Sequence, residues 1–296
     1  MMIKQRIKLA SVSVGLIITL NAIAVAQEQS PASNQREVAI TFDDLPLTRM
    51  NPKTWRQTTA KLLACIASKK IPAIGFVNEG KLYEQDRLDT ARVALLHMWL
   101  DAGLELGNHS FSHWDLHRIT AEKFKAAVLR GERITAKLLA KQGKKLRYFR
   151  HPFLHTGTSL AIKKDIEAFL SRYEYAVAPV TVDNSEWIFA HAYVLAAERN
   201  DEMMMKRIGE TYGSYMEAKF EYYEKQSRDL FGYEIKQTLL LHANALNGDY
   251  FARWLRCSPN AAMFSSRSKR HYAIKLIVQM TPTPDRRVYH GCNAGP

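Results

Sequence analysis

The chain has 296 residues, of which 47% are hydrophobic and 24% charged, with 14 Gly and 10 Pro. These proportions are ordinary for a globular protein and exclude collagen-like, low-complexity and wholly disordered classes. The length allows one large domain or two small ones, and an α/β fold of this size usually forms one. A formal net charge of +13 favours contact with nucleic acid, anionic membrane or acidic polymer, but says nothing about the fold. Three cysteines are too few for a disulfide scaffold.

Residues 1–26 have the pattern of a signal peptide. Three basic residues come first: Lys4, Arg6 and Lys8. A mostly apolar stretch follows over 9–25 and ends in Ala24-Val25-Ala26, a small-x-small cleavage pattern. We expect cleavage after Ala26 and a periplasmic or secreted protein, with an uncleaved N-terminal anchor as the alternative. Residues 27–36 are polar and indicate a short disordered leader, and no later run predicts a membrane span.

From residue 37 onward, predicted strands and helices alternate. Short β-branched or aromatic runs predict strands, and apolar residues at helical spacing predict helices. The predicted strands are 37–42, 73–77, 104–107, 148–149, 175–177 and 239–241. The predicted helices are 52–70, 88–102, 120–142 and 159–170, followed by a mostly helical stretch over 190–232. This alternation predicts a parallel sheet or barrel wrapped by helices, with its chemistry at the carboxyl ends of the strands.

The stretch over 190–232 carries large apolar residues at helical spacing. They are Tyr212, Tyr215, Met216, Phe220 and Tyr223. A stripe of this period packs more often than it cradles a ligand, so we predict a packing face.

Two polar clusters have residue types that suit a metal-dependent hydrolase. His109 and His113 are four residues apart, so in a helix both imidazoles would project to one side and could bind one metal ion. The pair Asp43-Asp44 could supply a third ligand, and three protein ligands plus water make a catalytic zinc site. Since neighbouring strand residues point to opposite faces, we expect one aspartate to bind metal and the other to act as base. Taken alone, either cluster is more often structural.

Three further polar clusters each follow a predicted strand. Arg150 could hold a catalytic carboxylate bidentately in its ionised form. Asp183 begins the segment Asp-Asn-Ser-Glu-Trp. His242 ends a hydrophobic strand, a position that suits a general acid.

The order of these clusters resembles the polysaccharide deacetylases, the NodB-homology group or carbohydrate esterase family four. Five motifs carry the resemblance: Thr41-Phe42-Asp43-Asp44, His109-x-x-x-His113, Arg150-x-Pro152-Phe153, Asp183-x-x-x-Trp187 and Leu239-x-Leu241-His242. Together they cover 37–242. The resemblance implies an α/β fold, a distorted (β/α) barrel that often has seven strands.

The resemblance also implies a metal centre and a base. Asp44, His109 and His113 would bind Zn²⁺ or another divalent transition metal. Asp43 would be the general base, and Arg150 would orient it.

The remaining motif residues would form the acid and the substrate pocket. His242 would protonate the leaving amine, and Asp183 would tune that histidine. The pocket would be lined by Trp187, Pro152, Phe153 and Leu241. The implied reaction removes the N-acetyl group of an acetamido sugar, in a substrate such as peptidoglycan or a chito-oligosaccharide. His117, His151 and His155 lie near these motifs, but the motifs do not call for them.

Two other function classes are weighed against the deacetylase. One is a non-catalytic or inactivated carbohydrate-binding relative of the same fold, against which the five intact motifs argue. The other is a nucleic-acid or membrane binder, suggested by the positive charge. Because the basic residues are scattered through helices without aromatic interleaving, we predict a solvated surface and no nucleic-acid partner. The sequence leaves the oligomeric state open.

The catalytic domain is predicted to span 37–250, with a helical insertion at about 190–232. The remaining residues, 251–296, form a basic tail without clear helical or strand periodicity. The family fold would need a last helix and strand here, and their loss would expose an apolar strand edge. Back-translation of 257–269 with synonymous codons, read two nucleotides along, permits such an ending. We hypothesise a frameshift near 251–253, with a tail that binds an anionic envelope surface as the alternative. Cys65 is expected to be a buried helix residue.

Overall fold

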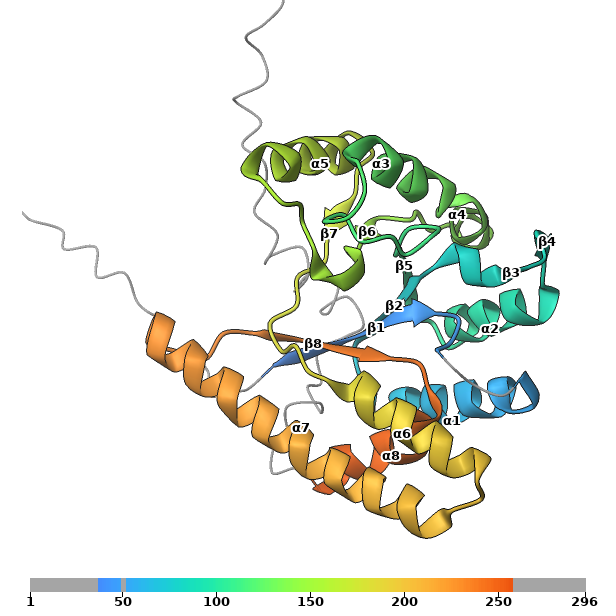
Figure 1. The fold of residues 1–296 in the computed structure, drawn as a ribbon, viewed down its shortest axis with the longest axis vertical. Helices are drawn as coiled ribbons and strands as arrows, with labels where there is room; N and C mark the ends of the chain where they lie inside the picture. Colours follow the sequence, from blue (N-terminus) through green and yellow to red (C-terminus); the bar gives the residue numbers. More distant parts are fainter. Residues whose placement is uncertain (1–36, 49–51, 258–296) are drawn as a thin grey trace, which may run out of the picture. The chain divides into compact units, whose positions relative to one another are not determined.

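The computed structural model describes residues 37–48 and 52–257, and every element given below lies in these ranges (Figure 1). The predicted signal peptide and leader lie outside the described residues, as does the tail beyond residue 257. In the described part of the chain, no helix combines the length and the apolar composition needed to cross a bilayer.

Six parallel strands form a curled sheet in the order β7-β6-β5-β2-β1-β8, which confirms the α/β half-barrel class (Figure 1). They are β1 (Val38–Leu45), β2 (Ala73–Val77), β5 (Glu105–Asn108), β6 (Tyr148–Phe149), β7 (Ala176–Val177) and β8 (Gln237–His242). All six coincide with predicted strands. A separate antiparallel hairpin joins β3 (Tyr83–Glu84) and β4 (Arg87–Leu88). The sequence does not predict it, because the charged residues Glu84 and Arg87 leave no apolar or β-branched run in this segment.

Eight helices follow the strands in the described residues. They are α1 (Trp55–Ser68), α2 (Thr90–Asp101), α3 (Ala121–Arg130), α4 (Arg133–Ala140), α5 (Leu160–Arg172), α6 (Glu186–Glu198), α7 (Glu202–Phe231) and α8 (Ala245–Cys257). The single helix predicted over 120–142 is wrong, since the chain breaks at Gly131 into α3 and α4. Short 3₁₀ turns are η1 (Pro52–Thr54), η2 (Glu79–Leu82) and η3 (Pro152–Leu154).

Helices cover the two ends of the sheet in separate groups (Figure 1). At the β8 end, α1 packs against α8, and α6 packs against both α7 and α8. At the β7 end, α3 packs against α5. The main core contains Phe42 of β1, whose ring meets Trp99 at 5.3 Å and Phe251 at 5.9 Å between centroids. Such edge-to-face contacts add to the stabilisation from burial.

The predicted packing face of α7 is confirmed. Tyr212, Met216 and Phe220 are fully buried, and Tyr215 and Tyr223 pack against the same core. Buried Cys65 lies in α1, as expected.

The segment that follows β7 reaches the opposite edge of the sheet. Ala178 N–H still donates to Phe149 of β6, while Val182 forms a parallel bridge with Leu239 of β8. The N–H groups of Thr181 and Val182 both donate to the carbonyl of β8 residue 238 at 3.0 Å. Residues 181 and 182 therefore cover part of the outer edge of β8. The expected exposed edge depends on the tail, which lies outside the described residues.

Helix α8 continues beyond the predicted domain end at residue 250. Phe251, Trp254 and Leu255 belong to the main core. The domain as described therefore extends to Cys257, and the rest of the unusual tail lies outside the described residues.

Candidate active site

The two aspartates of β1 lie at a bulge. The register with β2 shifts between Phe42 and Leu45, and Asp44 has a positive φ of 67°. An extra residue in one strand rotates the following side chain. The expectation that Asp43 and Asp44 face apart is therefore wrong, since carboxylate oxygens of both lie within 3.9 Å of His109 Nε2.

The two histidines come together through a loop, which corrects the helical expectation. His109 directly follows β5, and Ser110 and His113 have positive φ values of 62° and 50°. Asn108 Oδ1 accepts the N–H of Ser110, and Ser110 Oγ accepts the N–H of His113 at 3.2 Å. These local bonds fold the chain back so that the imidazole rings meet, with centroids 4.8 Å apart.

Two glycines allow neighbouring backbone to hold this loop. Gly80 N–H donates to the carbonyl of Phe111 at 2.9 Å, and a Cβ on Gly80 would come within 2.3 Å of that oxygen. A Cβ on Gly131, at the break between α3 and α4, would come within 2.5 Å of the backbone of Ser110. The helix break that the sequence missed therefore makes room for the histidine loop.

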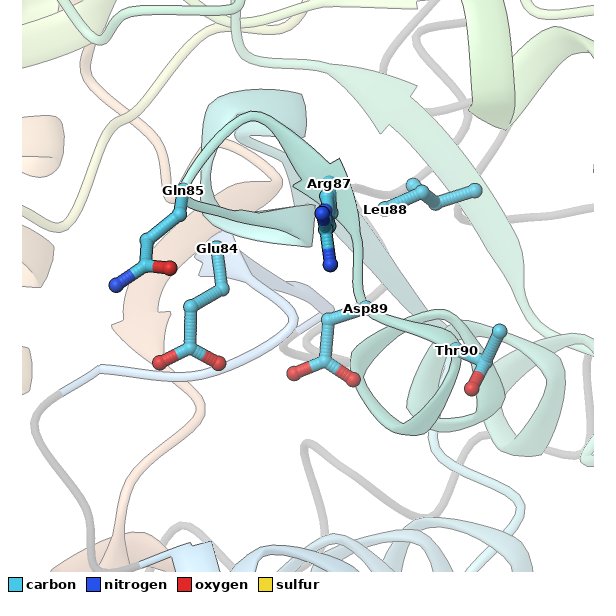
Figure 2. Close-up of a pocket in the computed structure, with 6 residues that line it drawn as sticks. All are labelled: Glu84, Gln85, Arg87, Leu88, Asp89 and Thr90. Carbon is cyan, nitrogen blue, oxygen red and sulfur yellow. The ribbon is translucent and has the colours of Figure 1, made fainter.

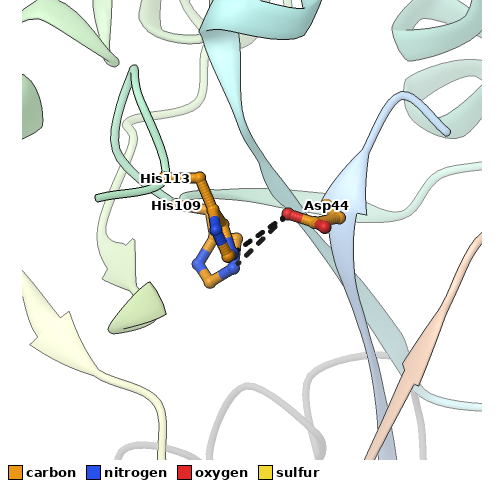
Figure 3. A group of neighbouring side chains, drawn as sticks. All are labelled: Asp44, His109 and His113. Atoms are coloured by element: carbon orange, nitrogen blue, oxygen red, sulfur yellow. Dashed lines mark ion pairs between the residues drawn. The ribbon is translucent and has the colours of Figure 1, made fainter. Parts of the chain in front are cut away.

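Asp44, His109 and His113 aim one donor atom each at a common point (Figure 3). Asp44 Oδ1 lies 3.3 Å from His113 Nε2 and 3.8 Å from His109 Nε2. Ligands at about 2.0–2.1 Å around a tetrahedral ion are separated by about 3.3 Å. His109 Nδ1 lies 2.8 Å from the carbonyl of Arg150. Donation of its proton there leaves Nε2 with a free lone pair, as a metal ligand needs.

The residues present fit a divalent cation. Asp44 Oδ1 is buried and has no hydrogen-bond partner, although it faces the Nε2 atoms of two imidazoles. Such an atom is costly unless a cation or donor meets it. Two imidazoles and one carboxylate are a donor set that suits zinc and related transition metals.

The charge states of these groups also suit a metal. Burial, only partly opposed by Asp44, lowers the pKa of His113 to about 4. The pKa of His109 is lowered as well, mainly by burial. For Asp44, burial works to raise the pKa, but the positive charge of Lys81 and the nearby histidines outweigh it and lower the pKa. Lys81 Nζ bonds Asp44 Oδ2 at 3.0 Å. At neutral pH the site therefore has two neutral imidazoles and an ionised carboxylate.

Arg150 holds the second aspartate. Its Nη1 lies 3.4 and 3.3 Å from the two carboxylate oxygens of Asp43. Its other nitrogens donate to Thr41 Oγ1 and to the carbonyls of Ala178 and Pro179. A fully bonded, 1% exposed guanidinium has little freedom to move. Asp43 is therefore fixed beside the metal donors.

His242 is paired with Glu186, which the sequence interpretation did not single out. Its Nδ1 lies 2.9 Å from Glu186 Oε2. Burial works against the charge of His242, but the hydrogen bond and charge of Glu186 outweigh it and raise the pKa to about 9. The imidazole is therefore a cation at neutral pH.

The expected partner, Asp183, instead accepts the N–H of Asn184 at 2.8 Å. Asn184 Nδ2 donates to the carbonyl of Leu240, and its Oδ1 accepts the N–H of Glu186. This anchor starts α6 so that its first carboxylate faces His242. One feature of the sequence could have pointed to Glu186, since this residue directly precedes Trp187 within the Asp183–Trp187 motif.

Of the four predicted pocket residues, two are exposed and two are buried. Phe153 is 56% exposed, and its ring lies 4.7 Å from that of His113. Trp187, 58% exposed, follows Glu186 in the first turn of α6. Pro152 is buried at the start of η3, and Leu241 is buried in the main core.

A second group of possible ligands lies beyond Phe153. Asp115 Oδ1 lies 2.7 Å from His155 Nδ1, and the rings of His155 and His117 are stacked 3.8 Å apart at an angle of 6°. Lone pairs of parallel rings run side by side and do not converge on one ion. Asp115 also accepts the N–H of His117. The group is thus already internally bonded.

A surface depression lies against the β3–β4 hairpin (Figure 2). Its lining is Glu84, Gln85, Arg87, Leu88, Asp89 and Thr90. The guanidinium of Arg92 lies 3.0 Å from Asp89 and 3.8 Å from Glu84. These carboxylates are therefore already paired with a cation, and none of the site residues lines this depression.

Comparisons with known proteins agree with the motif order. The family model for polysaccharide deacetylase matches residues 30–175. No match was found among the curated proteins. The crystal structure of a polysaccharide deacetylase from Bacillus cereus is similar with a TM-score of 0.50 and 14% identity, over 75% of this chain and 86% of that one.

Two further solved structures are similar. A family 4 carbohydrate esterase from Streptomyces lividans, in complex with acetate, has a TM-score of 0.47 and 16% identity over 80% of this chain and 95% of that one. A carbohydrate esterase family 4 pseudoenzyme from Bacillus anthracis has a TM-score of 0.48 and 12% identity. There, 75% of this chain covers only 60% of that one. The family-model match, and the motifs that meet at the carboxyl ends of the strands, both agree with the resemblance to the polysaccharide deacetylase family.

Proposed function

We propose that the chain is a divalent-metal-dependent deacetylase that hydrolyses the acetamido group of a glycan to a free amine and acetate. One observation carries the proposal: the donor atoms of Asp44, His109 and His113 converge, and the buried oxygen of Asp44 among them has no hydrogen-bond partner. The Asp43–Arg150 and His242–Glu186 pairs supply a base and an acid near that point.

Amide hydrolysis needs an activated water and a proton for the departing nitrogen. When bound, zinc would lower the pKa of a water molecule and polarise the acetyl carbonyl. Asp43, oriented by Arg150, would accept the proton of the attacking water. His242, kept protonated by Glu186, would donate a proton to the leaving amine. The two proton carriers have opposite charges at neutral pH, as their tasks require.

We propose an acetylated glycan as the substrate, with peptidoglycan and chito-oligosaccharides as the candidates. The exposed rings of Phe153 and Trp187 support this class, since aromatic faces pack against apolar faces of sugar rings. Phe153 contacts His113, which would bring a bound sugar close to the metal donors.

We further propose that the protein is exported and cleaved after Ala26. The basic start and small-x-small pattern of the N-terminal segment support this. N-terminal sequencing of protein recovered from the periplasm or medium should begin at Gln27. Recovery of the uncleaved chain in the membrane fraction would contradict cleavage.

The decisive experiment compares metal content and acetate release for the wild type and two variants, using N-acetylated chito-oligosaccharides and peptidoglycan fragments. Asp44→Asn should lose bound metal and activity together. Asp43→Asn should keep the metal but lose activity by about 10²–10⁴-fold, the usual contribution of a general base. Full activity after removal of the metal would overturn the proposal. Metal binding without turnover on any acetylated glycan would favour the non-catalytic relative.

A further inference from the structure

The carboxylate that pairs with His242 is itself held by a buried polar chain. Glu186 is 1% exposed, and its second oxygen, Oε1, accepts hydrogen bonds from the side-chain amides of Asn244 and Asn247. The bond from Asn247 is 2.7 Å long. Asn244 lies between β8 and α8, and Asn247 lies in the first turn of α8. The orientation of Glu186 therefore depends on two groups outside its own helix.

Asn247 is in turn oriented by helix α7. The hydroxyl of Tyr212 donates to Asn247 Oδ1 at 2.9 Å. The amide nitrogen of Asn247 can then point the other way, where it donates to Glu186 Oε1 and to the carbonyl of His242 at 2.9 Å. Tyr212 and Asn247 are both fully buried, so water is not available as a substitute donor.

The direction of the Asn247 amide matters for the charge on Glu186. With the amide reversed, an oxygen would face the carboxylate, and like partial charges would repel. A buried carboxylate that loses its donors is strongly destabilised as an anion. It would then hold the protonated imidazole of His242 less firmly. Tyr212 donates its hydrogen bond to this amide from α7, a helix that contains none of the five motifs.

We propose that Tyr212 and Asn247 are positioning residues for the general acid, so that α7 sets the geometry of the Glu186–His242 pair. The inference rests on the proposed deacetylase function for its catalytic consequence, but its structural part stands apart from turnover. Under this proposal, the long helical insertion orients an active-site pair in addition to packing against the core.

The test replaces Tyr212 with Phe, which removes the hydroxyl and keeps the ring. Tyr193→Phe is the matched control. Tyr193 is also buried, lies on α6 with Glu186, and donates its hydroxyl to Asp249 Oδ2 at 2.9 Å. Each variant deletes one hydrogen bond of a buried tyrosine; the bond itself is buried for Tyr212 and part-buried for Tyr193. Asn247→Ser is a second variant that breaks the same series of hydrogen bonds, because the shorter serine side chain does not reach Glu186.

The first readout is the downfield NMR resonance of the His242 Nδ1 proton in metal-free full-length protein at constant pH. In Tyr212→Phe and Asn247→Ser it should move upfield or vanish through faster exchange with water, while Tyr193→Phe should keep it. The second readout is kinetic: kcat should fall several-fold in Tyr212→Phe with KM unchanged, and Tyr193→Phe should match the wild type.

An unchanged resonance in folded Tyr212→Phe, or equal changes in Tyr212→Phe and Tyr193→Phe, would overturn the inference. A wild-type protein that releases no acetate would count against the proposed function only. The NMR comparison would still decide whether α7 orients the pair.

Discussion

At the scale of single residues, the site is built from pairs in which one side chain fixes another. Arg150 bonds both oxygens of Asp43, and Glu186 bonds His242. Residue types alone do not identify such partners. Asp183 and Glu186 are both acidic and lie in the same motif, and the bonds of Asn184 decide which one faces the histidine.

Glu186→Gln should shift the pH dependence of activity. Glu186 is the main group that raises the pKa of His242, to about 9, against the effect of burial. Without its charge, burial prevails and the pKa falls. The alkaline limb of the kcat profile that reports His242 should therefore move to lower pH. Asp183→Asn is the control, and its alkaline limb should coincide with the wild type. A shift in Asp183→Asn as large as in Glu186→Gln would favour the original sequence interpretation.

The same pair should stabilise the metal-free fold. Because the folded pKa of His242 is raised from 6.5 to about 9, its contribution is fully present below pH 6.5 and is lost as pH rises through about 9. Urea unfolding of metal-free protein between pH 6.5 and 9.5 should show this decline in the wild type. Glu186→Gln should show a smaller one, and parallel curves for the two proteins would contradict the assignment.

At the scale of elements, loops and a bulge bring the site together. The bulge in β1 turns Asp44 toward the histidines, and the break between α3 and α4 leaves room for the histidine loop. Neither feature has a periodic signal in the sequence. Both depend on chain segments that meet only after folding, which is why a single helix over 120–142 was expected.

Gly131→Ala should disturb the metal site from a distance. Its new Cβ would lie 2.5 Å from the backbone of Ser110, so the loop that carries His109 and His113 must move. We expect a loss of about 1–3 kcal/mol in unfolding free energy, typical of overpacking. Calorimetric titration should also show weaker zinc binding.

Gly213→Ala is the matched control for that change. Gly213 lies inside α7, and a Cβ there would meet nothing within 4 Å. Alanine should stabilise the helix by about 0.5–1 kcal/mol and leave zinc affinity unchanged. Equal zinc affinity in Gly131→Ala and the wild type would contradict the role given to the close approach.

At the scale of the whole molecule, buried neutral histidines should make the metal-free protein acid-sensitive. His151 packs against the rings of Phe124 and Phe149, and burial, with the nearby positive groups, lowers its pKa to about 4. In the unfolded chain it would take up a proton near pH 6.5. Stability should therefore fall as pH drops from 6.5 to 4, by about 3 kcal/mol for this group.

Urea unfolding of metal-free protein at pH 4.5 and 7 measures this effect. His151→Gln removes the titrating group, so the difference between the two pH values should shrink relative to the wild type. If the unfolding free energy differs between pH 4.5 and 7 by the same amount in both proteins, then His151 does not cause the loss of stability in acid.

The amino-acid sequence was enough to predict the alternation of strands and helices, the packing face of α7 and most of the residues with metal and acid–base chemistry. These properties are local, since residue type and period suffice to read them. Tertiary contacts were needed to show that Asp43 and Asp44 share one site, that Glu186 pairs with His242, and that residues 181 and 182 cover part of the edge of β8. Those outcomes depend on contacts between segments far apart in the chain, which no local pattern encodes.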